Sequence, residues 1–293
     1  MCSVKTKIEV DHESECLMNL IIQGIEIGNS DLRELAKISG GSLIERINGQ
    51  AFRLREATQR EGVAEYCAEV GLDFAFVDQD VRLTDFGLVA MDMDSTLVSI
   101  ESIDEIADLK GVKPQVAEIT ASTMRGEIDF AESLTRRTAL LQGLDQSALQ
   151  RVYDERLRLN PGAERMLQRM KSSGIKTLLI SGGFTFFTDR LRERLGIDYS
   201  AANTLEIVDG KITGKVLGEI IGAQGKADVL TRVTDELGLK RSQVIAIGDG
   251  ANDLKMLAEA GISIAYHAKP IVQQEATYSF NHIGLDGVVN LFG

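Results

Sequence analysis

The sequence predicts an α/β protein in which a Rossmann-like parallel sheet is interrupted by a helical insert and preceded by a small α+β unit. Short apolar runs that end in small or acidic residues are typical of strands buried on both faces of a parallel sheet. The run ends at Asp92 and Ser181 are 89 residues apart, whereas a βαβ unit needs roughly 30, so we expect an insert. The runs are LVAMDMD (88–94), TLLISGG (177–183), VIAIGDG (244–250) and ISIAY (262–266).

Residues 1–85 are predicted to form the N-terminal unit. Asn48-Gly49 between two alternating segments is a strong hairpin signal. The resulting order is β-α-β-β-α-β, a ferredoxin-like arrangement. The expected elements are a strand in 17–27, a helix capped by Asn29, Ser30 or Asp31, strands at 42–47 and 51–54, a helix over 58–70 and a strand at 73–77.

The second predicted unit, residues 86–293, contains the insert at about 99–160. Apolar residues in this segment keep helical spacing, for example at Ile103, Ile106 and Ala107. We therefore expect a helical cap over the carboxyl end of the sheet, where ligands bind in such folds. Further along, Asp209-Gly210 predicts a hairpin within residues 204–216.

Charge and cysteine content exclude several classes of function. The chain has 293 residues and a formal net charge of −12, which disfavours nucleic acid and anionic membranes as partners. Any phosphate chemistry would need local cations or a metal. The three cysteines show no CxxC spacing, and the sequence has no apolar run long enough for a membrane span. We expect a cytoplasmic protein without a disulfide framework or structural zinc.

Acidic residues follow two of the predicted strands. Asp92 and Asp94 are two apart, so if the strand continued both carboxylates would point to the same side. Asp249 and Asp253 follow another strand, and converging carboxylates need a cation such as Mg²⁺. Other interpretations of single motifs are turn or helix-capping aspartates, an EF-hand loop and a dinucleotide loop. Leu97 replaces the glycine that the EF-hand requires, and Asp253 replaces the third glycine of the dinucleotide loop.

Two further segments are ambiguous when taken alone. Ser181-Gly182-Gly183 could present a hydroxyl and backbone N–H groups to an anion, or could simply be a tight turn. It lacks the first glycine of a nucleophile elbow. Lys226 lies at the start of a predicted helix, where a lysine is usually a solvated surface charge.

Taken together, these segments resemble the haloacid dehalogenase superfamily of phosphotransferases. The resemblance covers about Leu88 to Phe292 and also implies the inserted cap. Within the superfamily it is strongest to phosphatases that act on O-phospho-L-serine, the last step of serine biosynthesis. The matching superfamily signatures are DMDST (92–96), Ser181, Lys226 and GDGAND (248–253), and the matching longer segments are DMDSTLVSIE, MRGEIDFAESLTRR, SGGF and GDGANDLKM.

The resemblance implies a role for each matching residue. Asp92 would be the nucleophile that forms an aspartyl phosphate, and Asp94 the acid and later the base. Mg²⁺ would be held by Asp92, the Asp94 carbonyl and Asp249, with Asp253 in support. The residues implied for the phosphoryl group are Ser181, Gly182, Lys226 and Asn252. Those implied for the rest of the substrate are Glu101 for its ammonium, Arg137 for its carboxylate, and Met124 and Phe130 for closure.

Alternatives remain at this stage. Glu101 and Arg137 could be solvated helix charges, and Arg136 competes with Arg137 for the role. The reaction could use another small phosphomonoester or another acceptor than water. Less favoured is a non-catalytic protein whose N-terminal unit senses an amino acid, because the β-α-β-β-α-β order resembles small amino-acid-sensing (ACT-like) modules. We expect that unit to mediate oligomer contacts, as in a homodimer, or weak regulation.

Overall fold

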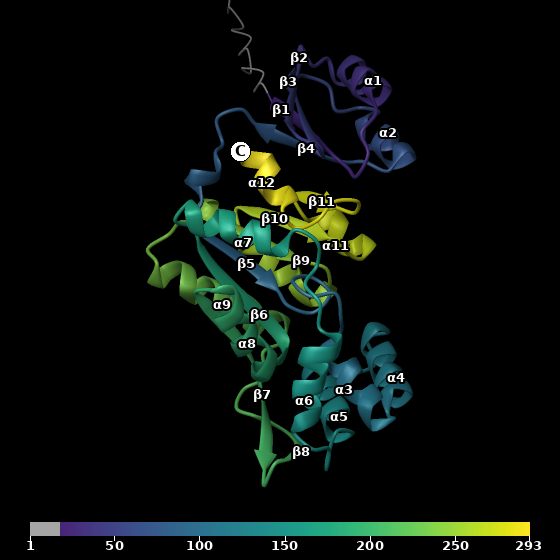
Figure 1. The fold of residues 1–293 in the computed structure, drawn as a ribbon, viewed down its shortest axis with the longest axis vertical. Coiled ribbons are helices and arrows are strands. Elements are labelled where there is room, and N and C mark those ends of the chain that lie inside the picture. The colour runs from purple at the N-terminus through teal and green to yellow at the C-terminus, as the bar shows by residue number, and fades with distance from the viewer. Residues whose placement is uncertain (1–17) are drawn as a thin grey trace, which may run out of the picture.

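The computed structural model describes residues 18–293, which fold into two sheets flanked by helices (Figure 1). The first sheet has four strands in the order β2-β3-β1-β4, and the second has seven in the order β11-β10-β9-β5-β6-β7-β8. No helix among these described residues is long and apolar enough to cross a membrane. Cys2, His12 and Cys16 lie outside the described residues.

The N-terminal sheet confirms the predicted β-α-β-β-α-β order. Its strands pair antiparallel, and its two helices cover one face (Figure 1). The elements are β1 (Met18–Gln23), α1 (Asn29–Ser39), β2 (Leu43–Asn48), β3 (Ala51–Ala57), α2 (Val63–Val70) and β4 (Asp73–Asp78).

Three local expectations in this unit were wrong. The first strand ends at Gln23 rather than reaching residue 27. Gly24, which follows it, packs so closely on Leu72 that a Cβ there would lie 2.4 Å from the Leu72 side chain. The N-cap of α1 is Gly28, whose N–H donates to the Asp31 carboxylate over 3.0 Å. Helix α2 starts five residues later than expected.

The other face of the N-terminal sheet packs on the second unit. Ile21 and Val77 from this face belong to the same apolar cluster as the central strand β5. At the edge of the contact, the buried Asp73 carboxylate accepts three backbone N–H bonds from residues 281–283, at 2.8–3.0 Å. Helix α12 also packs against β1 and β4. The two units therefore share a core and a hydrogen-bonded border.

The seven-stranded sheet is parallel except for the β7–β8 pair. Its central strands are fully buried because helices cover both faces, as the uninterrupted apolar runs predict. The strands are β5 (Leu88–Asp92), β6 (Lys176–Phe184), β7 (Tyr199–Val208), β8 (Lys211–Leu217), β9 (Val244–Gly248), β10 (Ile262–Tyr266) and β11 (Tyr278–Phe280). The helical segments are η1 (Leu83–Asp85), α7 (Ala163–Ser172), α8 (Thr185–Leu195), α9 (Ala223–Glu236), η3 (Arg241–Gln243), η4 (Ala251–Asp253), α10 (Leu254–Ala258), α11 (Pro270–Glu275) and α12 (Gly287–Phe292).

The segment between β5 and β6 forms the expected helical insert beside the carboxyl end of the sheet (Figure 1). Its two ends run together, since Ser99 N–H donates to the Arg158 carbonyl over 2.9 Å. One helix, α4, was not singled out by the sequence pattern because only Val116 in it is fully buried. The insert comprises α3 (Ser102–Lys110), α4 (Lys113–Met124), α5 (Phe130–Ala139), α6 (Ser147–Arg151) and the π-helical turn η2 (Val152–Arg156).

The β7–β8 hairpin extends beyond the sheet and lies along the insert (Figure 1). Asp209 and Gly210 form its turn with positive φ of 49° and 74°, as the Asp-Gly signal predicts. Three backbone hydrogen bonds of 2.8–2.9 Å join residues 143–146 of the insert to Gly210 and Ile212. The insert is thus fastened to the core at a third place besides its two chain connections.

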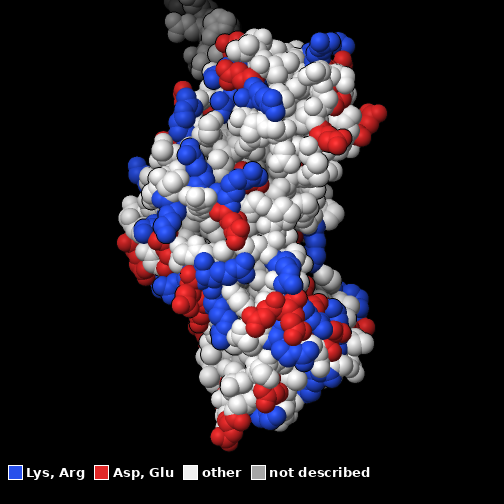
Figure 2. Space-filling view, viewed as in Figure 1, with Lys and Arg blue, Asp and Glu red and all other residues white. Residues whose placement is uncertain are grey.

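Basic and acidic side chains are interleaved over the face shown in Figure 2, including the insert in its lower part. Ion pairs account for part of this pattern. Arg156, for example, lies 2.5 Å from Glu105 and 2.7 Å from Asp108. Ion pairs of this kind bring acidic and basic side chains together on the insert.

Candidate active site

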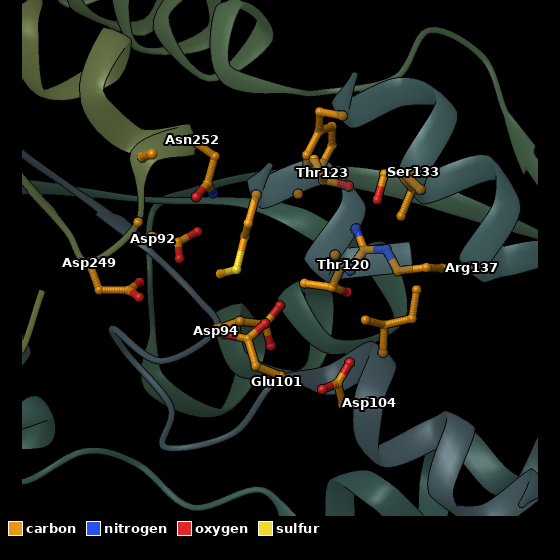
Figure 3. A pocket seen from close by; sticks show the side chains of 18 of the residues that line it. Asp92, Asp94, Glu101, Asp104, Thr120, Thr123, Ser133, Arg137, Asp249 and Asn252 are labelled. Atoms are coloured by element: carbon orange, nitrogen blue, oxygen red, sulfur yellow. The ribbon is translucent and has the colours of Figure 1, made fainter. Parts of the chain in front are cut away.

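A cavity of about 500 Å³ lies where the carboxyl ends of β5, β6 and β9 meet the insert. In Figure 3, Asp92, Asp249 and Asn252 occupy one side, and Arg137 and Ser133 the other. The cavity brings together nine of the twelve residues predicted from sequence to form the site: Asp92, Asp94, Glu101, Met124, Phe130, Arg137, Gly182, Asp249 and Asn252.

Three carboxylates cluster at the sheet end of the cavity. Asp92 ends β5, Asp249 follows β9, and Asp253 ends η4; one oxygen from each lies within 4.8 Å of the others. Burial raises the pKa of Asp92 well above its usual range and that of Asp249 to about 6, with Asp253 adding to both. Ionised carboxylates this close repel one another, and a hard divalent cation bound by their oxygens would offset the repulsion.

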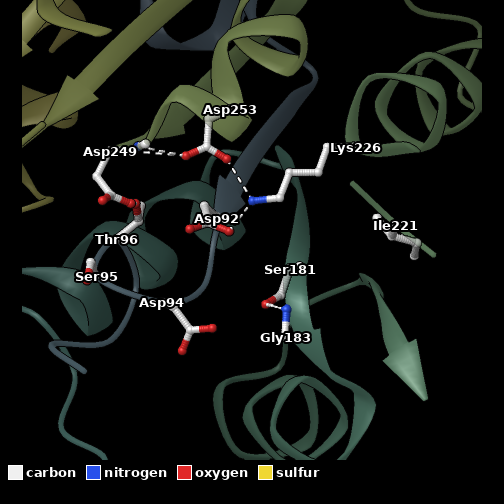
Figure 4. Close-up of polar contacts among 12 residues, drawn as sticks. Asp92, Asp94, Ser95, Thr96, Ser181, Gly183, Ile221, Lys226, Asp249 and Asp253 are labelled. Atoms are coloured by element: carbon white, nitrogen blue, oxygen red, sulfur yellow. Dashed lines mark hydrogen bonds and ion pairs between the residues drawn. The ribbon is translucent and has the colours of Figure 1, made fainter. Parts of the chain in front are cut away.

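Lys226 stands behind this cluster rather than on the surface. Its side chain reaches from α9 between two carboxylates, with Nζ 2.5 Å from Asp92 Oδ1 and 2.7 Å from Asp253 Oδ1 (Figure 4). Burial alone would lower the pKa of Lys226, but the charges of Asp253 and Asp92 outweigh that effect and raise it. The ammonium is fully buried and does not line the cavity, yet it touches Asp92 directly.

Asp94 is separate from the three clustered carboxylates. The strand ends at Asp92 and the chain turns, so the condition for strand alternation is not met, although both side chains line the same cavity. The Asp94 carboxylate instead accepts hydrogen bonds from Ser102, from its N–H over 2.9 Å and from its hydroxyl over 3.1 Å. Burial, with a contribution from Glu101, raises the pKa of Asp94 to about 7. This carboxyl can therefore hold or release a proton near neutral pH.

The loop after β5 is fixed by side chains from distant segments. Thr96 donates to Asp249 Oδ1 over 3.1 Å. Asn160, where the insert returns to the core, donates its amide N–H groups to the carbonyls of Ser95, Thr96 and Val98. Both ends of the insert and both acidic segments are therefore held in one hydrogen-bonded arrangement.

The wall facing the carboxylates comes from the insert. Arg137 points into the cavity, and its buried Nε has no hydrogen-bond partner among the described residues (Figure 3). Arg136, its neighbour in sequence, instead forms an exposed ion pair with Glu132. Glu101 also lines the cavity and accepts a 2.8 Å hydrogen bond from the Ser95 hydroxyl. The wall thus offers one guanidinium and one carboxylate to a ligand.

Phe130 closes the cavity against the core. Its ring lies so close to Gly182 and Gly222 that a Cβ at either would be 2.8 or 3.1 Å from a ring carbon. Met124 lines the same opening and remains 64% exposed. A glycine at position 182 is therefore needed for the insert to sit this near the sheet.

Sequence reasoning missed several residues of the site. Ser102, Asp104 and Ser133 line the cavity. Asp104 lies three positions from Glu101 and Ser133 four from Arg137, so helical spacing could have found these two, whereas Ser102 directly follows Glu101 and has no such spacing. Lys269, in the loop after β10, also lines it and carries no such signal. Ser181 does not line the cavity: it is fully buried, and its hydroxyl accepts a 2.8 Å bond from Gly183 N–H.

Replacing Asp249 by asparagine is expected to change the pH dependence of stability. The folded carboxyl titrates at about 6 and the unfolded one near 3.8, so the folded form holds a proton that the unfolded form has lost. Stability from this group is therefore lost as pH rises from about 4 to about 6. In a chelating buffer, the melting temperature of Asp249→Asn should rise relative to that of the parent chain as the pH increases from 4 to 8.

The exposed Asp189→Asn substitution on α8 is the matched control and should show a constant difference. Adding a divalent cation at pH 8 should stabilise the parent chain more than Asp249→Asn, because ligand binding to the folded state adds stability. A difference that does not vary with pH, or equal stabilisation of both chains by the cation, would contradict the assignment.

Comparison with known proteins gives concordant matches. The family model of haloacid dehalogenase-like hydrolases matches residues 86–261, and one for a domain of unknown function matches residues 20–63. A phosphoserine phosphatase of Polaromonas sp. is 51% identical over 75% of this chain and 96% of that protein. A crystal structure of a probable phosphoserine phosphatase from Vibrio cholerae is 38% identical, with TM-score 0.83 over 94% of this chain and 86% of that one. A haloacid dehalogenase family hydrolase from Salmonella enterica is 32% identical, with TM-score 0.85 over 94% and 98%.

Proposed function

Because the chain belongs to the haloacid dehalogenase-like hydrolase family, we propose that it hydrolyses O-phospho-L-serine to L-serine and inorganic phosphate, the last step of serine biosynthesis. One observation carries the proposal: a single cavity has an end with three clustered carboxylates that could hold a cation and, opposite it, a wall with Arg137 and Glu101. The relatives that match most of the chain bear the same activity in their names. We also propose a cytoplasmic enzyme, in line with its cysteine pattern.

The insert wall suits the amino-acid part of this substrate. Arg137 can bind the carboxylate through two parallel N–H donors, and its Nε has no other partner among the described residues. Glu101 can accept hydrogen bonds from the ammonium. Phe130 and Met124 would cover the bound substrate, which excludes water from the rest of the cavity.

In the first step, Asp92 Oδ attacks the phosphorus and the bond from phosphorus to the serine oxygen breaks. Asp94 gives its proton to that oxygen, so L-serine leaves with a neutral hydroxyl group and an aspartyl phosphate remains. A pKa of about 7 leaves a substantial protonated fraction of Asp94 at neutral pH. Forming a covalent bond to Asp92 divides one difficult displacement into two easier ones.

In the second step, water attacks the phosphorus of the aspartyl phosphate. Asp94, now a carboxylate, accepts a proton from that water, and the bond to Asp92 breaks. Inorganic phosphate leaves and both carboxyl groups return to their starting states. Ser102 fixes the Asp94 carboxylate for both transfers through its two hydrogen bonds.

Asp92, Asp249 and the Asp94 carbonyl, with Asp253 in support, would hold Mg²⁺, which neutralises phosphoryl oxygens when bound. Lys226 adds a fixed positive charge beside Asp92. We propose that Ser181, Gly182 and Asn252 donate hydrogen bonds to the phosphoryl group, with the Ser181 hydroxyl accepting from Gly183 N–H while it donates to the substrate.

Phosphate release tests the proposal. With Mg²⁺, the purified chain should hydrolyse O-phospho-L-serine with a kcat/KM at least about tenfold above that for O-phosphoethanolamine, which lacks the carboxylate. Phosphorylated sugars should be poorer still. Equal activity on all of these substrates would reject phosphoserine as the substrate, and no release from any of them would reject the phosphatase function.

Replacing Arg137 by alanine should remove the preference for a carboxylate. The kcat/KM for O-phospho-L-serine should fall by about 10²-fold, since a charged hydrogen-bonded partner is lost, while that for O-phosphoethanolamine should change little. Arg136→Ala is the matched control because its side chain pairs outside the cavity with Glu132. Equal losses on both substrates would show that Arg137 does not bind the carboxylate.

A further inference from the structure

A second cavity, of about 270 Å³, lies between the N-terminal sheet and the end of helix α12. It is at the opposite end of the molecule from the insert, near β1, β4 and α12 in Figure 1. Residues of β1, β3, the segment after β4 and α12 form its walls. They are Asn19, Arg53, Arg55, Asp78, Gln79, Val81, Arg82, Leu291, Phe292 and Gly293.

Three arginines line this small space. Arg53 and Arg55 are two apart on β3 and so project from the same face of the strand. Arg55 pairs with Glu45 over 2.8 Å, whereas Arg53 lies 3.9 Å from that carboxylate and also donates to the Gly293 carbonyl. Burial, followed by the charge of Arg55, lowers the pKa of Arg53. The cavity wall thus carries three guanidinium groups and one side-chain carboxylate, that of Asp78, so positive charge remains in excess there.

The same walls hold buried polar atoms without partners. Among residues 18–293, neither Arg53 Nε nor Gln79 Nε2 donates a hydrogen bond, and Asn19 Oδ1 accepts none. Asn19 is only 6% exposed. Buried polar groups are nearly always paired, and one left unpaired costs free energy. Three on the walls of one cavity indicate a missing partner.

We propose that this cavity is a second binding site, for a small oxyanion that also carries a hydrogen-bond donor. The oxyanion would accept from Arg53 and Gln79, whose side chains would turn their unpaired N–H groups toward it, and it would reduce the repulsion among the arginines. The donor would face Asn19. Both products of the proposed reaction have this combination, since L-serine carries an ammonium beside its carboxylate and monohydrogen phosphate carries a hydroxyl. The cavity goes beyond the proposed function, because none of its residues lines the active-site cavity.

Isothermal titration calorimetry with the full chain tests the proposal, with L-serine and inorganic phosphate added in separate experiments. At least one of them should bind to a site that Arg53→Gln weakens by about tenfold or more. Gln79→Met keeps the side-chain length and removes one donor, so it should also weaken binding at this site. It provides the test should Arg53→Gln fail to fold. Arg46→Gln on β2, exposed and outside the cavity, is the control and should bind as the parent chain does.

Two further measurements separate this site from the active site. Arg137→Ala should retain the binding that Arg53→Gln loses, and Arg53→Gln should release phosphate from O-phospho-L-serine at the parent rate. Binding of L-serine alone would select an amino acid, and binding of phosphate alone an inorganic ion. If both probes bind equally to the parent, Arg53→Gln and Gln79→Met, or bind to none of them, the cavity holds only water and the proposal is wrong. A failure of the phosphatase assay would leave this binding result unaffected.

Discussion

Replacing Asp92 by asparagine is expected to lower phosphate release from O-phospho-L-serine by about four orders of magnitude or more. The amide cannot form the aspartyl phosphate, and the neighbouring carboxylates are held by other partners, Asp249 by the Thr96 hydroxyl. Asp94 is turned toward Ser102, and Asp253 is held by Lys226 and by the N–H groups of Asp249 and Gly250. Steady-state phosphate release and trapping of phosphorylated protein from labelled substrate would measure the loss.

The folded state should survive this substitution. Asparagine has nearly the same shape, and Lys226 keeps its 2.7 Å contact with Asp253. Asp189→Asn, an exposed helix position, should retain full turnover. Substantial turnover by Asp92→Asn, or phosphorylated protein recovered from it, would show that another group is the nucleophile.

Replacing Lys226 by methionine should damage both stability and catalysis. Methionine keeps the length of the side chain but leaves two buried carboxylates without a cation, which costs about 3–5 kcal/mol for a broken buried pair. Turnover should fall by about 10²- to 10³-fold, because a positive charge beside the nucleophile is lost. Urea unfolding and phosphate release would measure the two effects.

The two effects can be separated by pH. Without Lys226, Asp92, whose pKa burial already raises, should take up a proton on folding, so the destabilisation should be smaller at pH 5 than at pH 8. Lys215→Met, at an exposed position on the hairpin, should change neither property. If Lys226→Met unfolds at the same urea concentration as the parent chain, the buried ion pairs are not the reason for its position.

The sequence predicted the sheet and its acidic edge because both depend on local patterns. An uninterrupted apolar run such as VIAIG is compatible with a strand buried on both faces, and parallel strands bring their carboxyl ends to one edge. Asp92 and Asp249, 157 residues apart in the sequence, therefore met as expected. The N-terminal β-α-β-β-α-β order followed from alternation and one Asn-Gly turn.

Tertiary contacts decided what local patterns could not predict. A single Asp-x-Asp motif does not show that the chain turns after the first aspartate, so the hydrogen bonds of Asp94 with Ser102 were not foreseen. Arg136 and Arg137 differ only in the direction they face on α5, and this depends on where the insert packs. The contact between the hairpin and the insert could not be predicted either, because a turn sequence does not indicate which helices pack beside it.

That hairpin constrains how the cavity can exchange its contents with solvent. A domain joined to the rest of the molecule only by two adjacent chain segments can rotate about them as about a hinge. A third attachment away from that line, at residues 143–146, blocks such a swing unless the β7–β8 ribbon bends with it or its three bonds break. Any such rotation of the insert would therefore have to bend a two-stranded ribbon that contributes no residue to the cavity lining.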